Sequence, residues 1–204
     1  MKKIPTLFRR VFRRNRVIGV LPEITDGCEE AFLHGDATVK WDGACCAIIG
    51  GELYRRYDAK NGKPVPEGAV KCQEEPDPIT RHFPCWVKCD RTNPNDKWLW
   101  AAHDEILESM KHYINISSIK ILDGTYEAVG THFNANPQHF DVDLLMPHGK
   151  HKLKVKRTYD GVRAFLKKND DIEGIVFWLD EKPVCKIKRT DFGFEWNGKG
   201  DNSK

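Results

Sequence analysis

The sequence predicts an α+β fold with antiparallel sheets and flanking helices. Short strand patterns are separated by turn signals, as in 44–49 and 52–56, which the pair Gly50-Gly51 connects. Two longer segments have helical spacing, and they lie between groups of strands instead of alternating with single strands. A chain of 204 residues can bury roughly 70% of its unfolded surface, so we expect one domain over 1–204.

The expected elements follow from local patterns along the chain. Apolar or alternating segments predict the strands 36–41, 44–49, 52–56, 119–122, 125–129, 142–146, 174–179 and 184–188. Apolar stripes at helical spacing predict helices over 97–114 and 159–168, and the first stripe begins with Leu99 and Ala102. Residues 60–96 are rich in Pro, Gly and charge with little periodicity, which predicts an irregular surface insertion.

Positive charge is concentrated at the N-terminus. The net charge is +3, but residues 1–22 hold seven basic and no acidic residues, which leaves −4 for the rest. Pairs of apolar residues in 7–12 alternate with pairs of arginines, which predicts a basic N-terminal helix or arm. We expect its arginines to bind nucleic-acid phosphates. Solvated arginines on a docked helix and a membrane-surface helix are the alternatives. The arginines are Arg9, Arg10, Arg13 and Arg14.

Composition favours an intracellular protein. Hydrophobic residues make up 40% and charged residues 31%, as in ordinary globular proteins. No apolar run approaches the ~20 residues of a membrane span, and the basic start lacks the apolar core of a signal peptide. Seven cysteines without paired spacing indicate reduced thiols. We therefore expect a cytoplasmic protein that is neither secreted nor bound to a membrane.

The motif Lys40-Trp41-Asp42-Gly43 indicates covalent nucleotidyl transfer. Two further motifs follow it in the order that this chemistry needs, Glu173-Gly174 and Lys186-Ile187-Lys188. A lysine attacks a phosphorus atom only when its amine is neutral. Lys186 and Lys188 alternate on one predicted strand and share a face, so they could contact the α-phosphate and disfavour a protonated Lys40. Gly43 is expected to let the backbone approach the nucleotide. The alternative is that Lys40 is an ordinary exposed lysine.

Two carboxylates and one arginine complete the set of candidate residues. Glu173 precedes a buried strand and suits a magnesium ligand, although a surface acid is the alternative. Glu127 lies inside an apolar strand and needs a partner such as a ribose hydroxyl or an arginine. Arg56 could be that partner in a structural pair, or a contact to sugar or phosphate. A zinc site is a weak alternative, because the four candidate ligands match no common spacing. They are Cys72, His82, Cys85 and Cys89.

These motifs resemble the ATP-dependent RNA ligases of the covalent nucleotidyltransferase superfamily, and above all the small single-domain type that includes the vertebrate 5′-to-3′ RNA ligase. The resemblance runs nearly end to end. The segments that carry it are 4–10, 40–46, 53–58, 126–131, 144–149, 173–178 and 186–189. Cys85 stands where the family leads us to expect glycine, and residues 131–141 differ from the vertebrate form.

The resemblance implies a ligase adenylation domain that joins RNA 5′-phosphate and 3′-hydroxyl ends with ATP and Mg²⁺ or Mn²⁺. It casts Lys40 as the nucleophile, Lys186 and Lys188 as α-phosphate ligands, and Glu173 as the metal-linked residue. The nucleotide contacts would also include Asp42, Gly43, Arg56 and Glu127. We expect a monomer without an OB domain, because the chain ends soon after the last motif. Alternatives are a capping guanylyltransferase, a DNA ligase, or a noncatalytic RNA-binding module that kept the fold.

Overall fold

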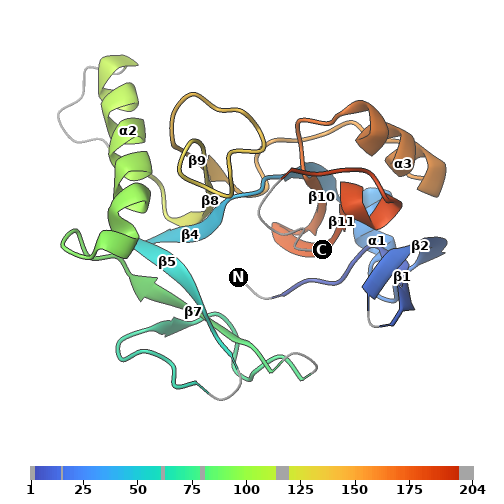
Figure 1. Ribbon diagram of the computed structural model, residues 1–204, viewed down its shortest axis with the longest axis horizontal. Coiled ribbons are helices and arrows are strands. Elements are labelled where there is room, and N and C mark those ends of the chain that lie inside the picture. The colour runs from blue at the N-terminus through green and yellow to red at the C-terminus, as the bar shows by residue number, and fades with distance from the viewer. Residues whose placement is uncertain (1–2, 15, 61–62, 79–80, 114–119, 198–204) are drawn as a thin grey trace. The chain divides into compact units, whose positions relative to one another are not determined.

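The computed structural model describes residues 3–14, 16–60, 63–78, 81–113 and 120–197. Its contacts divide the chain into two compact units (Figure 1). Unit 1 consists of Met1–Lys3 and Gly43–Pro147, and unit 2 of Ile4–Asp42 and His148–Lys204. The described strand pairs within the three sheets are antiparallel and the helices are few, which confirms an α+β composition.

Unit 2 is built on a three-stranded sheet in the order β11-β10-β3, together with a separate hairpin β1-β2. Its strands are β1 (Phe8–Arg13), β2 (Arg16–Ile24), β3 (Asp36–Lys40), β10 (Gly174–Leu179) and β11 (Lys182–Lys188). Its helices are α1 (Glu29–His34), α3 (Tyr159–Lys168) and the short 3₁₀ helix η2 (Arg189–Phe192).

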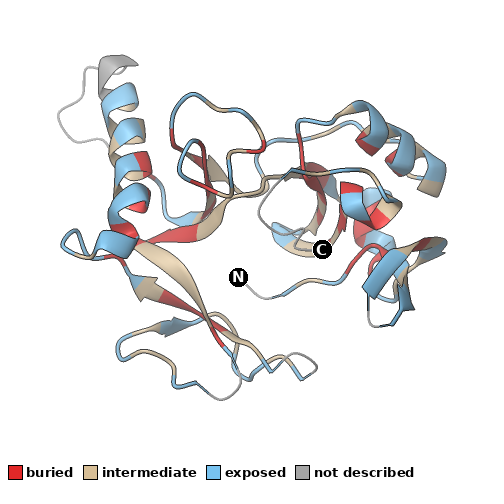
Figure 2. Cartoon of the chain, in the orientation of Figure 1, coloured by how far each residue is buried: buried red, intermediate tan, exposed pale blue. Residues whose placement is uncertain are grey.

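One face of the unit 2 sheet packs into an apolar core. Ile175, Phe177 and Ile187 are fully buried, and they alternate along β10 and β11 with residues of the opposite face (Figure 2). Phe32 of α1 meets Phe177 edge to face at 5.4 Å between ring centroids. Since Cys185 and Ile187 of β11 are buried in the core, Lys186 and Lys188 lie on the other face.

The predicted N-terminal helix is wrong, because residues 8–13 and 16–24 are paired antiparallel strands of a β-hairpin. Arg14 takes a left-handed backbone conformation in the turn, with φ of 48°. Phe8 is buried against Tyr159 and Phe32, whereas Phe12 is 61% exposed. The spacing of the apolar pairs allows a helix, but pairing with 16–24 and the burial of Phe8 decide for strands.

Unit 1 contains a six-stranded antiparallel sheet in the order β6-β7-β5-β4-β8-β9. The strands are β4 (Ala44–Ile49), β5 (Glu52–Ala59), β6 (Val70–Lys71), β7 (Phe83–Lys88), β8 (Gly124–Val129) and β9 (Leu144–Pro147). The 3₁₀ helix η1 (Pro94–Asp96) leads directly into helix α2 (Lys97–Tyr113). Leu99 and Ala102 of α2 are buried in a core with Cys46, Leu53 and Ala128, so the predicted helix is confirmed as far as residue 113 and the first part of its apolar stripe is confirmed.

The prediction of an irregular insertion over 60–96 is wrong in part, because β6 and β7 lie in this range and both join the sheet. Pro84 lies inside β7 although proline donates no ladder hydrogen bond. Cys85 and Trp86 are nevertheless buried, and β7 pairs along its whole length with β5.

The predicted strand 119–122 also fails within the described residues, since 120–122 are irregular and residue 119 lies outside them. The next segment pairs with β4 and β9 instead, and the carboxylate of Asp123 accepts hydrogen bonds from the backbone of Gly50 and Gly51. The helix over 159–168 has the predicted bounds, and the other predicted strands are present, some with ends shifted by a few residues. Among the described residues, no helix is both long and apolar enough to cross a membrane.

Candidate active site

Strand register brings Lys40, Lys188 and Glu173 together in unit 2. Gly174 is the backbone partner of Lys40 on one side and of Lys188 on the other. The residue just before it, Glu173, forms ion pairs with both lysines, through Oε2 to Lys40 and Oε1 to Lys188. Close packing needs a glycine at position 174, because a Cβ atom there would lie 2.2 Å from the carbonyl oxygen of Ile187. The site therefore consists of residues that are 133 and 148 positions apart along the sequence.

Glu173 is a buried anion held between cations. Its exposed fraction is only 4%. Burial raises the pKa of this carboxyl, but the charges of Lys40 and Lys188 and their hydrogen bonds outweigh that effect and lower the pKa below its ordinary value. Glu173 is consequently ionised at neutral pH, and Lys40 faces a buried carboxylate instead of bulk solvent.

Lys186 is an amine with a strongly lowered pKa. Burial lowers its pKa, and the positive charges of Lys40 and Lys188 lower it further, to about 8. Its backbone is fixed by the N-terminal segment: the amide of Leu7 donates to the Lys186 carbonyl at 2.7 Å, and the Lys186 amide donates to Pro5 at 3.1 Å. The three amines therefore form one cationic cluster around a single carboxylate.

The residues that follow Lys40 are also anchored within unit 2. Trp41 packs edge to face against His151, with ring centroids 5.3 Å apart. The indole nitrogen of Trp196 donates to the Asp42 carboxylate at 2.7 Å. These contacts hold the strand end that carries the candidate nucleophile.

Gly43 and Glu127 meet in unit 1. The backbone amide of Gly43 donates to Oε1 of Glu127 at 3.1 Å, and its carbonyl accepts from Asn134 at 2.7 Å. A Cβ atom at position 43 would lie 1.9 Å from the carbonyl oxygen of Ala128. The glycine is thus required by contact with strand β8, a reason that the sequence did not reveal.

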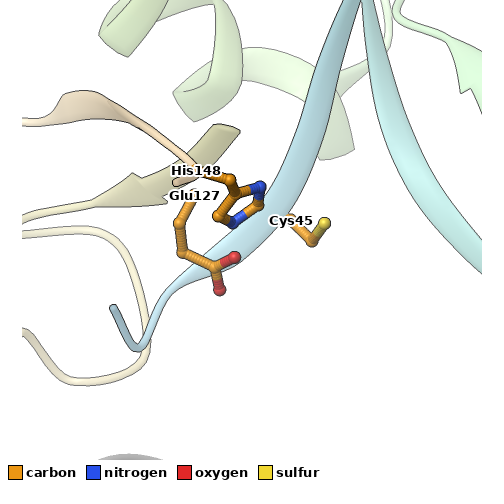
Figure 3. Close-up of side chains that lie close together, drawn as sticks. All are labelled: Cys45, Glu127 and His148. Atoms are coloured by element: carbon orange, nitrogen blue, oxygen red, sulfur yellow. The ribbon is translucent and has the colours of Figure 1, made fainter. Parts of the chain in front are cut away.

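Glu127 and Arg56 flank the same thiol. Cys45 pairs with Glu127 across β4 and β8 (Figure 3), and the register of β4 with β5 brings Arg56 beside Cys45. Burial and, to a smaller extent, the charge of Glu127 raise the pKa of Cys45, and Arg56 opposes them, so that the pKa is about 12. Arg56 also donates from Nε to Asp58 at 3.0 Å. Both predicted nucleotide contacts are therefore on one row of the unit 1 sheet.

The basic N-terminal residues divide into two kinds. Arg9 pairs with Glu23 at 2.6 Å on an exposed surface, and Arg10 pairs with the buried Asp191 at 2.9 Å. Within the described part of the chain, no acidic side chain pairs with Arg13 or Arg14.

The predicted zinc ligands are not brought together among the described residues, where no metal-binding group contains any of the four. Cys85 instead donates to the carbonyl of Tyr57 at 3.4 Å.

Three residues of the site were missed by sequence reasoning: Asp191, Asn134 and Trp196. Asp191 is the third residue of η2, and its carboxylate accepts from the backbone amide of Lys188 at 2.9 Å. An acid three positions after Lys188 is a recognisable helix-start signal. The contacts of Asn134 and Trp196 join distant segments and have no local signal.

Comparison with known proteins decides the family. A family model described as RNA ligase 1 matches residues 53–202. The chain belongs to the RNA ligase 1 family. The resemblance to the vertebrate type of RNA ligase is thereby confirmed. The matched region contains Arg56, Glu127, Glu173, Lys186 and Lys188, and it begins after Lys40.

Three curated relatives carry the name RNA ligase 1. The protein of Danio rerio is 24% identical over 163 residues, covering 69% of this chain and 46% of its own length. Those of Pongo abelii and Rattus norvegicus are 26% and 24% identical, covering 67% and 70% of this chain and 45% and 47% of their own lengths. The chain thus spans about half the length of the curated relatives it matches.

Proposed function

We propose that this chain is an ATP-dependent RNA ligase that joins a 5′-phosphate to a 3′-hydroxyl through a lysyl-adenylate. The observation that carries the proposal is the cluster in unit 2, where the amine of Lys40 is held against Glu173, and Lys186 and Lys188 lie on β11, on the other side of the central strand β10. Family membership supports the ligase class.

In the first step the Lys40 nitrogen attacks the α-phosphorus of ATP. An N–P bond forms, the bond to the β-phosphate oxygen breaks, and pyrophosphate leaves. Lys186 and Lys188 supply positive charge to the α-phosphate oxygens as negative charge grows there. Charge on these two amines also favours a neutral Lys40.

Lys40 is held as an ammonium by its ion pair with Glu173, so it must lose a proton to solvent water before its nitrogen can attack. A buried carboxylate between two ammonium groups stabilises the protonated amine in the resting protein. The proposal therefore requires this pair to separate before Lys40 attacks. Arrival of the negatively charged triphosphate, which competes for the same lysines, provides the driving force.

The donor set also fits a single-carboxylate ligand for Mg²⁺ or Mn²⁺. Magnesium is commonly bound by one or two carboxylates together with substrate phosphates and water. Glu173 would hold the ion once Lys40 or Lys188 releases one of its oxygens. The ion would neutralise charge on the triphosphate.

The second and third steps use RNA. A 5′-phosphate oxygen attacks the lysyl-adenylate, and the N–P bond breaks to leave an adenylated RNA end. A 3′-hydroxyl then attacks the 5′-phosphorus and releases AMP, which seals the strand. In this proposal Asp42, Gly43, Arg56 and Glu127 contact the nucleotide.

Labelling of the protein tests the proposal. The chain is incubated with magnesium and with ATP or GTP labelled at the α-phosphate, and acid-labile, alkali-stable label on the protein is measured. We expect labelling by ATP only, reduced at least about 10³-fold in Lys40→Ala because the nucleophile is lost. The matched control is Lys182→Ala, an exposed lysine at the start of the same strand as Lys186, which should label normally.

The other outcomes select other functions. Labelling by GTP would assign the chain to capping chemistry. Absence of label from both nucleotides would support a noncatalytic RNA-binding module. Labelled protein that seals a nicked DNA duplex but not RNA would indicate a DNA ligase.

A further inference from the structure

The hairpin β1-β2 carries a charged and apolar end that the chemistry of Lys40 does not use. Phe12 and Val17 are direct cross-strand partners, and they are 61% and 39% exposed. The neighbouring Ile18 is 59% exposed. Arg13 and Arg16 are the next cross-strand pair towards the turn, followed by Arg14.

The arginines at this end are arranged at a cost in stability. Like charges directly opposite each other on paired strands repel, and this is the arrangement of Arg13 and Arg16. No acidic side chain of the described residues pairs with Arg13, Arg14 or Arg16, and all three are exposed. A polyanion that places phosphates between them would remove this repulsion.

The same hairpin is anchored at its other end to the strand of Lys186. Thr6 forms a parallel bridge with Lys186, and the amide of Leu7 donates to the Lys186 carbonyl at 2.7 Å. Arg10 pairs with the buried Asp191, which also accepts from the Lys188 amide. The base of the hairpin is therefore part of the active-site framework of unit 2, while its end remains free for a ligand.

We propose that the hairpin end binds the RNA strand, with Arg13, Arg14 and Arg16 on consecutive phosphates and a base stacked on Phe12. Arginines beside an exposed aromatic ring are the usual combination for single-stranded nucleic acid. This inference rests on the proposed ligase function and assigns to it an RNA contact outside the lysine cluster. Arg9 and Arg10 are then structural, because each already has an acidic partner.

Direct RNA binding tests the site without ATP. The probe is a fluorescent, 5′-phosphorylated single-stranded RNA, and its affinity is measured across a sodium chloride titration. The variant is R13Q/R14Q/R16Q. The matched control is K154Q/K167Q/K168Q, which removes three exposed charges elsewhere in unit 2.

We expect the arginine variant to bind roughly tenfold more weakly or worse at low salt. Its log-log salt slope should fall by about 2, since each phosphate contact to a single strand contributes about 0.7. The lysine control should keep the wild-type slope. F12T should weaken binding about fivefold or more through lost stacking, with little change in slope. Thermal unfolding of each variant checks that the fold is intact.

Three results would overturn the proposal. Equal loss in the lysine control would mean that only net charge matters. Unchanged affinity and slope in the arginine variant would remove the site. The third result combines two measurements: F12T leaves the RNA affinity unchanged, and it converts a wild-type dimer to a monomer in size-exclusion chromatography. That combination would identify the apolar end as a protein contact. Because binding is measured without ATP, a failure of ATP labelling in the wild-type protein is a separate outcome that counts against the ligase assignment.

Discussion

The two carboxylates assigned to the nucleotide, Glu173 in unit 2 and Glu127 in unit 1, are held by different kinds of partner. Glu173 pairs with the side-chain ammonium groups of Lys40 and Lys188. Glu127 accepts a hydrogen bond from the backbone amide of Gly43. Glu173 is buried, whereas Glu127 is only partly buried.

The side-chain contacts of Glu173 can be exchanged for contacts to a ligand, whereas the backbone contact of Glu127 is part of the rigid framework of the sheet. A long lysine side chain can leave a carboxylate when a more highly charged phosphate arrives. A backbone amide cannot leave without moving its strand, and Gly43 is further fixed by the close approach of Ala128. Unit 2 is therefore built for charge rearrangement, and the Gly43 region of unit 1 is built to hold its shape.

The largest expected effect concerns this framework. In Gly43→Ala the new Cβ would lie 1.9 Å from the backbone oxygen of Ala128, which no side-chain movement can relieve. We expect a loss of at least about 4 kcal/mol in the free energy of unfolding, measured by urea denaturation. Gly50→Ala is the control, since no atom lies within 4 Å of its Cβ position and only backbone strain of about 1 kcal/mol applies. Equal losses in both variants would contradict the framework role.

The next effect compares the two carboxylates directly. Glu173→Gln leaves Lys40 and Lys188 as neighbouring cations without their shared anion, so we expect a loss of about 2–4 kcal/mol in the free energy of unfolding. Glu127→Gln keeps an oxygen that can accept from Gly43, and its loss should stay below about 1 kcal/mol. Urea denaturation of the two variants at pH 7 measures both values. The comparison fails if Glu127→Gln is the more damaging change.

The smallest effect is a pH dependence from Lys186. Its pKa is about 8 in the folded chain, below the ordinary lysine value of 10.5. Between these values the unfolded chain binds more protons, so the Lys186 contribution to stability rises with pH. From pH 7 to pH 10 the wild type should gain about 2 kcal/mol relative to Lys186→Met. Urea denaturation of both proteins at the two pH values measures this gain, and a constant or falling difference would show that Lys186 is not perturbed in this way.

Much of the sheet structure was predictable because its signals are local. The Gly50-Gly51 turn, the run 174–179 and the helix over 97–113 follow from turn residues and apolar periodicity. The N-terminal hairpin was not predictable, since the apolar pairs in 7–12 fit a helix equally well. Only pairing with 16–24 and the burial of Phe8 distinguish the two.

The candidate site was predictable in part for the same reason. Lys186 and Lys188 share a face because strand side chains alternate, and this needs no tertiary information. The ion pairs of Glu173 depend on the register of β10 with two other strands, which no local pattern encodes. The glycine at position 43 was noticed, but its contact with Ala128 belongs to a strand about 80 residues away.

Sequence alone determined the chemical groups available to this protein: a lysine motif, a paired-lysine strand, two acids within or just before apolar strands, and a basic N-terminus. These follow from residue type and short-range spacing. The tertiary structure decided which groups touch, because long-range pairing brings Glu173 between Lys40 and Lys188 and turns the basic segment into a hairpin. Side chains along a strand alternate between the two faces of the sheet, so a register shift of one residue would have moved these side chains to the opposite face.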